Sequence, residues 1–243
     1  MSTQSVFAGY MKELLTDFKA KMKCHQDDGQ PRGICQLLEI SADTPLNQFR
    51  LYEPAEEENR PGEAERVYGT TTSICQKLEE WITTKEIKEI NGKIYLKGEC
   101  SYEEYTDRTQ NTRSQRCTPK TELLNWDHYT KDTTVRKGDS STQALNLCMN
   151  IVTLILVNSG LTKTGARVEL EVAKKDNYCD LVYKALANWA TPELAEKIMF
   201  QWFTVQNIPE GKRPRYEITG QDFFEAISIA NSTRHHPEKG MHC

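Results

Sequence analysis

Cysteine is the residue type that could do the most chemistry in this chain. The sequence of 243 residues holds eight cysteines, spread over most of its length. An even number of cysteines distributed in this way is typical of disulfide bonding in an oxidising compartment. The alternative is that cysteines within predicted helices are small, buried hydrophobic residues that stay reduced. We expect disulfides, and the candidates are Cys24, Cys35, Cys75, Cys100, Cys117, Cys148 and Cys179, with Cys243 as the expected odd one out.

One candidate pairing joins two helices that we expect to pack together. Cys148 lies on a predicted central helix, and Cys179 lies on the helix that follows it. A bridge between them would remove loop-closure entropy from the unfolded chain, worth about 3–4 kcal/mol in the simple model. It requires Cα atoms about 4.4–6.8 Å apart, so it depends on where the helices cross.

Two sets of residues have types that bind metals, but neither predicts a metal site. Cys24, His25 and Cys35 could supply zinc ligands, yet no second pair with zinc-site spacing follows. The other set lies in the C-terminal tail, where binding is more often adventitious, and consists of His235, His236, His242 and Cys243. We expect neither a metal nor a cofactor.

Catalytic patterns are also missing from the sequence. It contains no phosphate-binding glycine loop, HExxH or GxSxG motif. His128 is the histidine in the most ordered context, but Asp127 is its neighbour in sequence instead of an opposed partner. The carboxylate pairs Glu79-Glu80 and Glu103-Glu104 are expected at exposed positions. We therefore expect a protein that is not an enzyme and has no small-molecule substrate.

The charge balance argues against long-range attraction to nucleic acid or membranes. Lys and Arg number 31 and Asp and Glu 35, which gives a formal net charge of -4. Residues 101–138 place basic side chains beside tyrosines, which suits a nucleic-acid or glycan surface, but interleaved acidic residues favour a solvated insertion. The basic residues are Arg108, Arg113, Arg116 and Lys120.

The sequence gives mixed signals about the compartment. Its first residues enter an amphipathic helix without the pattern of a signal peptide, and no apolar run reaches the roughly 20 residues that span a bilayer. The sequon Asn231-Ser232-Thr233 mildly favours a secreted or surface context. An intracellular protein, an excised domain and unconventional export all remain open.

The element around which the others must be arranged is a predicted central helix at about 141–159. Eleven of the fourteen residues from 144 to 157 are apolar. Ser140 or Ser141 is expected to cap its N-terminus and Gly160 to stop it. The polar exceptions share one narrow face and must find hydrogen-bond partners if buried; they are Asn146, Asn150 and Thr153. This pattern predicts a helix buried on most sides by other helices.

Apolar residues at spacings of three and four predict the surrounding helices. They cover residues 4–23, 34–40, 72–82, 176–189, 192–203 and 219–230. Thr191, Pro192 and Glu193 match the N-cap, first position and first-turn acid of one of these helices. The acidic residues 53–69 contain two prolines and are predicted as a loop, while Leu161–Val172 is predicted as a connection.

The predicted fold class is therefore mainly α. It is an irregular helical bundle around the buried central helix, with one short β-hairpin near 87–97 and long polar loops. Residues 1–232 are expected to form a single helical domain, with an N-terminal lobe of residues 1–52 as the alternative. Residues 233–243 are expected to be a disordered tail.

Short motifs around the central helix carry a resemblance to a known family. Leu147-Cys148 opens an apolar helix that closes on Asn158-Ser159-Gly160, and a charged linker leads to the helix with Tyr178-Cys179. Residues 140–190 thereby resemble the extracellular alpha domain of the schizont-infected cell agglutination (SICAvar) variant antigens of malaria parasites. The resemblance implies antigenic variation on the surface of infected red cells, with a host receptor or antibody as the protein partner.

Two functions from different classes follow. The first is a disulfide-braced helical surface or interaction domain outside the cell or on the infected-cell surface. The second is an intracellular helical structural protein, such as a viral nucleocapsid or matrix protein, with reduced cysteines and with nucleic acid as a conceivable partner. The state of the cysteines separates them.

The hairpin supplies a first testable prediction. Asn91-Gly92 between short alternating segments predicts a type I′ turn, which needs positive φ at both positions. Replacing both residues by Val should disorder residues 87–97 and leave the helices intact, because β-branched residues resist that conformation. Amide hydrogen exchange measures this directly. Unchanged exchange in the hairpin would contradict the turn.

Overall fold

The computed structural model describes the greater part of the chain. The described residues are 5–21, 33–38, 44–45, 63–98, 100–106, 117–130, 133–135, 138–158, 161–164, 167–170, 178–203, 216–218 and 226–227. The predicted tail, Cys24 and Cys243 lie outside these ranges, as does most of the predicted helix at 219–230. In that predicted helix, Ala226 and Ile227 are described and both are buried. Single-domain organisation stays a prediction.

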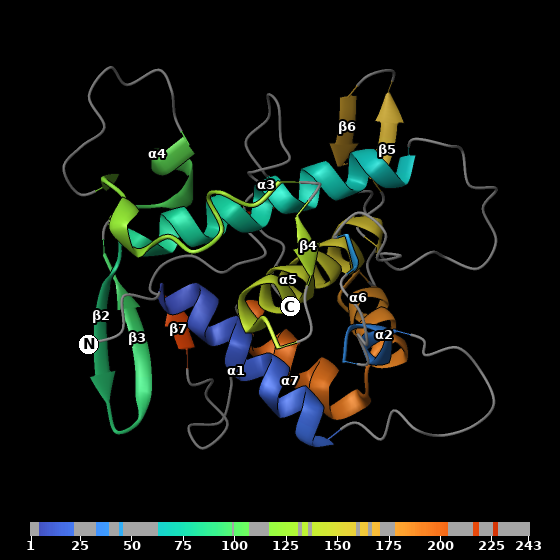
Figure 1. Ribbon diagram of the computed structural model, residues 1–243, viewed down its shortest axis with the longest axis horizontal. Coiled ribbons are helices and arrows are strands. Elements are labelled where there is room, and N and C mark those ends of the chain that lie inside the picture. The colour runs from blue at the N-terminus through green and yellow to red at the C-terminus, as the bar shows by residue number, and fades with distance from the viewer. Residues whose placement is uncertain are drawn as a thin grey trace.

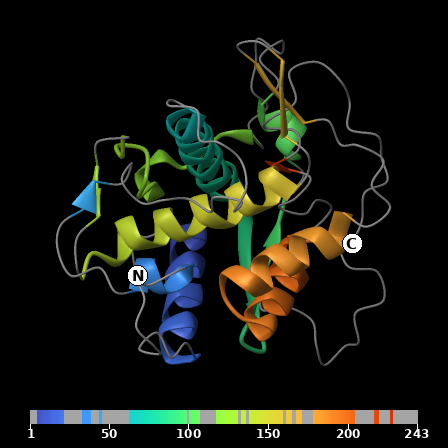
Figure 2. The same cartoon turned by 90° about the vertical axis from the view of Figure 1, so that its right-hand side faces the viewer.

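The central helix is confirmed as the buried axis of a mainly helical fold. It is α5 (Ser140–Asn158), and every side chain from Thr142 to Leu156 is buried. It lies between α3 (Glu63–Thr83) on one side and α1 (Val6–Lys21) on the other (Figure 2). The expected serine cap is wrong, because the Asp139 carboxylate accepts hydrogen bonds from the backbone N–H groups of Ser141 and Thr142, at 2.9 and 3.3 Å.

Two buried polar residues of α5, Asn150 and Thr153, find partners within the helix itself, although Asn146 Nδ2 is buried without a hydrogen-bond partner among the described residues. Asn150 Nδ2 donates to the carbonyl oxygen of Asn146 at 2.8 Å and to its Oδ1 at 2.7 Å. Thr153 Oγ1 donates to the carbonyl oxygen of Met149 at 2.7 Å. Local bonds of this kind let a helix bury polar side chains without help from its neighbours.

α1 follows its predicted amphipathic pattern. Its inner face packs on α5 and α3, and its buried residues are Phe7, Ala8, Tyr10, Met11, Leu14, Leu15 and Phe18. Tyr10 links it to α7 (Pro192–Trp202), since the Tyr10 hydroxyl accepts a hydrogen bond from Trp202 Nε1 at 2.8 Å. α7 begins as predicted: Thr191 is its N-cap and accepts from the backbone N–H of Leu194.

α3 begins nine residues before residue 72, the predicted start of this helix, where Thr72 or Ser73 is the expected cap, and its first turns lie inside the segment predicted as an acidic loop. The Pro61-Gly62 pair ends just before the helix, and the Glu63–Arg66 run that follows consists of good helix formers with acid in the first turn. Thr72 is therefore an interior position. It is buried, and its Oγ1 lies 3.5 Å from the Met149 sulfur of α5.

α6 (Tyr178–Trp189) packs on α5 and α7, and α2 (Ile34–Leu38) lies beside it (Figure 1). Gly33, immediately before α2, has φ of +60°, and a Cβ there would lie 2.3 Å from the Trp189 carbonyl oxygen. The chain can approach the end of α6 this closely only because this residue is glycine.

The predicted hairpin is confirmed as β2 (Glu86–Ile90) and β3 (Lys93–Lys97). Asn91 and Gly92 have φ of 53° and 74°, as a type I′ turn requires. The structure adds β7 (Tyr216–Ile218), which pairs with β3 in parallel and was not predicted.

Other short elements were also missed in the sequence. Two antiparallel pairs join β1 (Thr44–Pro45) to β4 (Thr134–Val135) and β5 (Leu161–Thr164) to β6 (Arg167–Leu170). The second pair replaces part of the predicted connection, because Lys and Thr side chains gave no buried-strand signal. The polar insertion contains α4 (Tyr102–Thr106) and a 3₁₀ turn at Thr121–Leu123.

Burial of α5 generates a stability prediction. Leu154 is fully buried, so Leu154→Asp places an unpaired carboxylate in the interior and should lower the free energy of unfolding by about 3–5 kcal/mol. Ser140→Asp, at the exposed first position of the same helix, is the matched control and should change it by less than about 0.5 kcal/mol. Denaturant unfolding with the disulfides intact measures both. Equal midpoints for the two variants would contradict the buried axis.

Candidate functional site

Two disulfides brace the helical core and the polar insertion. Cys75 of α3 pairs with Cys148 of α5, with Cα atoms 6.2 Å apart. Cys100 pairs with Cys117, with Cα atoms 5.1 Å apart. Cys35 is also disulfide-bonded, and the described part of the chain has no free cysteine. Closing a loop as long as the one between Cys75 and Cys148 stabilises the fold by about 4 kcal/mol in the simple model.

The expected Cys148–Cys179 bridge is wrong, since Cys148 is bound to Cys75. α5 contacts both α3 and α6, and the Cys148 position faces α3. Cys179 is disulfide-bonded elsewhere, at the start of α6. Helical spacing alone identifies buried cysteines but does not tell which neighbouring helix a cysteine faces.

The segment from Cys117 to Thr130, here called the 117–130 segment, runs along α3 and is held by a buried carboxylate. The expectation that Glu79 is exposed is wrong, because the side chain is fully buried. Glu79 Oε1 accepts from the backbone N–H of Asn125 at 3.0 Å and from its Nδ2 at 3.3 Å. Glu79 Oε2 accepts from the backbone N–H of Trp126 at 3.0 Å.

Two more side chains on the same face of α3 bind the 117–130 segment. Gln76 Nε2 donates to the carbonyl oxygens of Trp126 and Tyr129, at 2.6 and 2.8 Å. The Thr83 hydroxyl accepts from the backbone N–H of Lys120 at 3.0 Å. Positions 76, 79 and 83 are three and four apart, so they form one stripe of α3, and this stripe satisfies the backbone of a segment that has little regular structure of its own.

Glu79 also reaches the beginning of α1. The Ser5 hydroxyl donates to Glu79 Oε1 at 2.5 Å, and the same oxygen of Ser5 accepts from the backbone N–H of Ala8 at 3.1 Å. Ser5 therefore caps α1 while it is bound to the carboxylate. A negative charge near a helix N-terminus is favourable, so one carboxylate joins α1, α3 and the 117–130 segment.

Burial raises the pKa of Glu79 above its ordinary value of 4.5, and the hydrogen bonds from Ser5, Trp126 and Asn125 partly oppose the rise. These partners donate, so each of them favours the ionised form. The balance between desolvation and donated hydrogen bonds decides how strongly this carboxylate stabilises the fold at neutral pH.

A buried lysine lies at the other end of the segment. The Lys85 ammonium is 4.6 Å from the centre of a Trp81 ring and donates to the Cys100 carbonyl oxygen. Trp81 Nε1 donates to the same oxygen at 3.1 Å. Burial lowers the pKa of Lys85 to about 8, opposed by the charge of Glu104. These contacts fix the backbone beside the Cys100–Cys117 disulfide.

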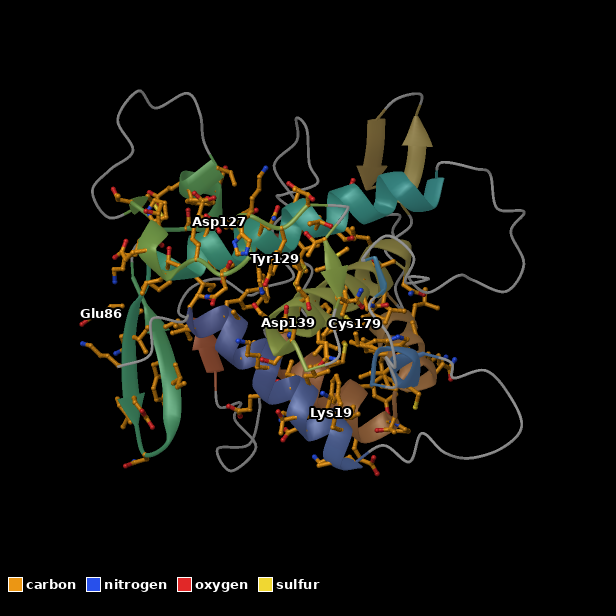
Figure 3. The ribbon with its side chains drawn as sticks, in the orientation of Figure 1. Lys19, Glu86, Asp127, Tyr129, Asp139 and Cys179 are labelled. Carbon is orange, nitrogen blue, oxygen red and sulfur yellow. A yellow bond between two sulfur atoms is a disulfide. The ribbon has the colours of Figure 1, made fainter. Side chains whose placement is uncertain are left out.

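The outer side of the 117–130 segment is exposed. Asp127 and His128 point into solvent with His128 Nδ1 3.1 Å from an Asp127 oxygen, and Figure 3 shows Asp127 and Tyr129 over the middle of α3. Tyr129 is half-buried, and its hydroxyl bonds to the side chain of Ser141 at the start of α5. Further exposed side chains on this surface are Thr118, Lys120, Thr121, Glu122 and Thr130. The arrangement presents polar side chains on a fixed backbone, which suits recognition of another molecule.

The remaining predicted site residues are dispersed. Arg108, Arg113 and Arg116 lie outside the described residues, and so do His25 and the histidines of the tail. Glu103 is exposed, whereas Glu104 is half-buried and accepts from the backbone N–H of Ser101 at 3.0 Å. Across the described ranges, no group of three or more His, Cys, Asp or Glu is placed to hold a metal ion. In the same ranges, no helix is long and apolar enough to cross a membrane.

Glu79 is the buried residue of this site whose position the sequence analysis did not predict. The signal was available: with Ile74, Cys75, Leu78 and Trp81 on the inner stripe, a helical wheel places position 79 beside that stripe and position 80 farther from it. A glutamate at such a position must be paired or hydrogen-bonded.

No known protein family, curated protein or solved structure matches the chain significantly.

The Glu79 contacts predict a specific loss of stability. Glu79→Gln keeps the size of the side chain but turns an amide NH₂ toward a backbone N–H, so one hydrogen bond is lost and one donor left buried. The free energy of unfolding should fall by about 1–3 kcal/mol, measured by denaturant unfolding. Glu80→Gln, one residue away and half-buried, is the control and should change it by less than about 0.5 kcal/mol.

The pH dependence of the same comparison tests the charge state of Glu79. Because its pKa is raised in the fold, the folded protein holds this proton more tightly, and the contribution to stability is complete below about pH 4.5. The difference in free energy of unfolding between wild type and Glu79→Gln should therefore shrink as the pH rises through the pKa of Glu79 in the folded protein. Denaturant unfolding between about pH 4 and pH 8 measures this difference. An advantage that grows with pH would show that the donated hydrogen bonds outweigh desolvation.

Proposed function

We propose that this chain is a binding domain that works outside the cell or on a cell surface, and that it acts by recognition without catalysis. The observation that carries the proposal is the Cys75–Cys148 disulfide between two buried helices, together with the second bridge at Cys100–Cys117. Disulfides of this kind persist in oxidising compartments and are rare in the cytosol. They favour an extracellular setting over an intracellular structural protein with reduced cysteines.

The 117–130 segment is the proposed contact surface. Its backbone is fixed by Gln76, Glu79 and Thr83, while Asp127 and His128 project into solvent. A polar surface on a fixed backbone loses little conformational entropy when a partner binds. The proposed partner is a protein, either a host receptor or an antibody.

A more specific identity is proposed from the resemblance to the SICAvar alpha domain, which would make the chain a variant antigen of infected red cells. Its supporting motifs lie on two helices: Leu147-Cys148 is in the first half of α5, and Tyr178-Cys179 begins α6. In such an antigen, disulfides would hold the core while exposed loops change in sequence.

Alkylation of native material tests the compartment. Intact protein treated with a thiol reagent in denaturant, without reductant, should leave Cys75, Cys100, Cys117 and Cys148 unmodified in peptide maps. The same cysteines should all react after reduction, which is the control. Reaction of all cysteines without reductant would overturn the proposal and would favour the intracellular structural protein.

Labelling of whole cells tests the location. A membrane-impermeant amine reagent applied to intact cells that produce the protein should modify exposed lysines such as Lys120. A cytosolic protein of the same cells serves as the control for leakage. Modification only after lysis would contradict display at a surface.

A further inference from the structure

β2 forms an outer edge of the three-stranded sheet, whose order is β2-β3-β7. Among the described strands, only one side of β2 is therefore paired. All five of its residues are exposed, and Figure 1 shows the strand on the side of the hairpin that faces away from the helices. Ile87 and Ile90, at 47% and 48% exposure, are the large hydrophobic side chains that the described part of the chain leaves in solvent.

The free edge of β2 carries backbone groups ready to pair. In a hairpin closed by two residues, the flanking pair, here Ile90 and Lys93, exchanges backbone hydrogen bonds. The alternation along the strand then turns the N–H and C=O groups of Ile87 and Glu89 away from β3. An unpaired edge of this kind is a template for another strand.

The sequence of β2 is complementary to itself in one antiparallel register. When the two-fold axis passes through Ile87, the two copies of Ile87 lie directly opposite each other. Their outward N–H and C=O groups then form backbone hydrogen bonds between the two strands. On the other face of the sheet, each Glu86 lies opposite the Lys88 of the second strand. Glu86 and Lys88 already share that face, since Lys88 Nζ lies 3.8 Å from Glu86 Oε2. Both charged pairs are attractive and the central pair is apolar.

Charge excludes the neighbouring symmetric registers. An axis at Lys88 would set this lysine opposite its own copy, and an axis at Glu89 would do the same for two glutamates. Like charges directly opposite each other destabilise a strand pair. A two-fold axis at Ile87 is thus the arrangement that this strand favours.

We propose that the chain self-associates by antiparallel pairing of β2 with β2 of a second copy, centred on Ile87. The two three-stranded sheets then become one continuous sheet across the dimer. The pairing covers Ile87 and closes on itself, since it uses the single free edge of β2 in each copy. Self-complementary charge along β2 is what indicates a second copy as the occupant.

Charge reversal tests the proposal without touching the core. Sedimentation of the full, oxidised chain from about 10 μM to 1 mM should show a monomer–dimer equilibrium, as expected for a small interface. Glu86→Lys sets a new lysine opposite Lys88 of the second copy, and Lys88→Glu sets a new glutamate opposite Glu86. Each variant alone should associate at least roughly tenfold more weakly than wild type. Glu13→Lys, an exchange at a half-buried position on α1 outside the sheet, is the control and should associate like wild type.

Mixing the two variants gives the decisive measurement. In a mixed pair, the Glu86→Lys strand carries lysine at positions 86 and 88, and the Lys88→Glu strand carries glutamate at both. Each opposed pair therefore again joins a lysine to a glutamate, and both pairs are attractive. An equimolar mixture should therefore recover dimers while each variant alone does not. Recovery supports pairing of β2 with β2 at this register. Three results would each overturn the proposal. The wild-type chain could stay monomeric over the whole concentration range, either charge-reversal variant could dimerise as strongly as wild type, or the mixture could form no more dimer than the single variants.

Discussion

Burial of α5 from Thr142 to Leu156 is the constraint on which the rest of the structure depends. A helix that is apolar on nearly every side needs neighbours on every side, and here α1, α3 and α6 all contact it. Asn150 and Thr153 of α5 bond within their own helix, whereas Gln143 accepts a hydrogen bond from Lys19 of α1. The Cys75–Cys148 disulfide then fixes the contact with α3 covalently.

α3 divides its surface between two tasks. One face contributes Cys75 and other buried residues to the core, and an adjacent stripe of polar residues organises the 117–130 segment. Trp126 anchors that segment in the core, where its ring packs edge-on against Phe7, and hydrogen bonds with α3 hold the backbone on either side of this anchor. Glu79 connects the core to the 117–130 segment, since its buried carboxylate accepts hydrogen bonds from Ser5 at the start of α1 and from the backbone N–H groups of Asn125 and Trp126.

The sequence predicted what depends on local patterns and missed what depends on pairing between distant residues. Apolar periodicity located α1 and α5, cap chemistry located the start of α7, and the Asn91-Gly92 pair located the hairpin turn. The partner of Cys148 was not predictable, because helical spacing gives the direction of a side chain relative to its own helix only. β7 is three residues long and pairs with a strand far away in sequence, so it had no local signal at all.

The parallel pairing of β3 with β7 has a consequence for biogenesis. Ile94 is aligned with Tyr216, so the sheet cannot be completed until the chain through residue 218 has left the ribosome. The hairpin, by contrast, involves neighbouring residues and can form early. During synthesis both edges of that hairpin would be open. The unpaired backbone groups of one nascent chain could then pair with those of another chain on an adjacent ribosome. Pairing of β7 with β3 leaves this hairpin with one open edge, that of β2.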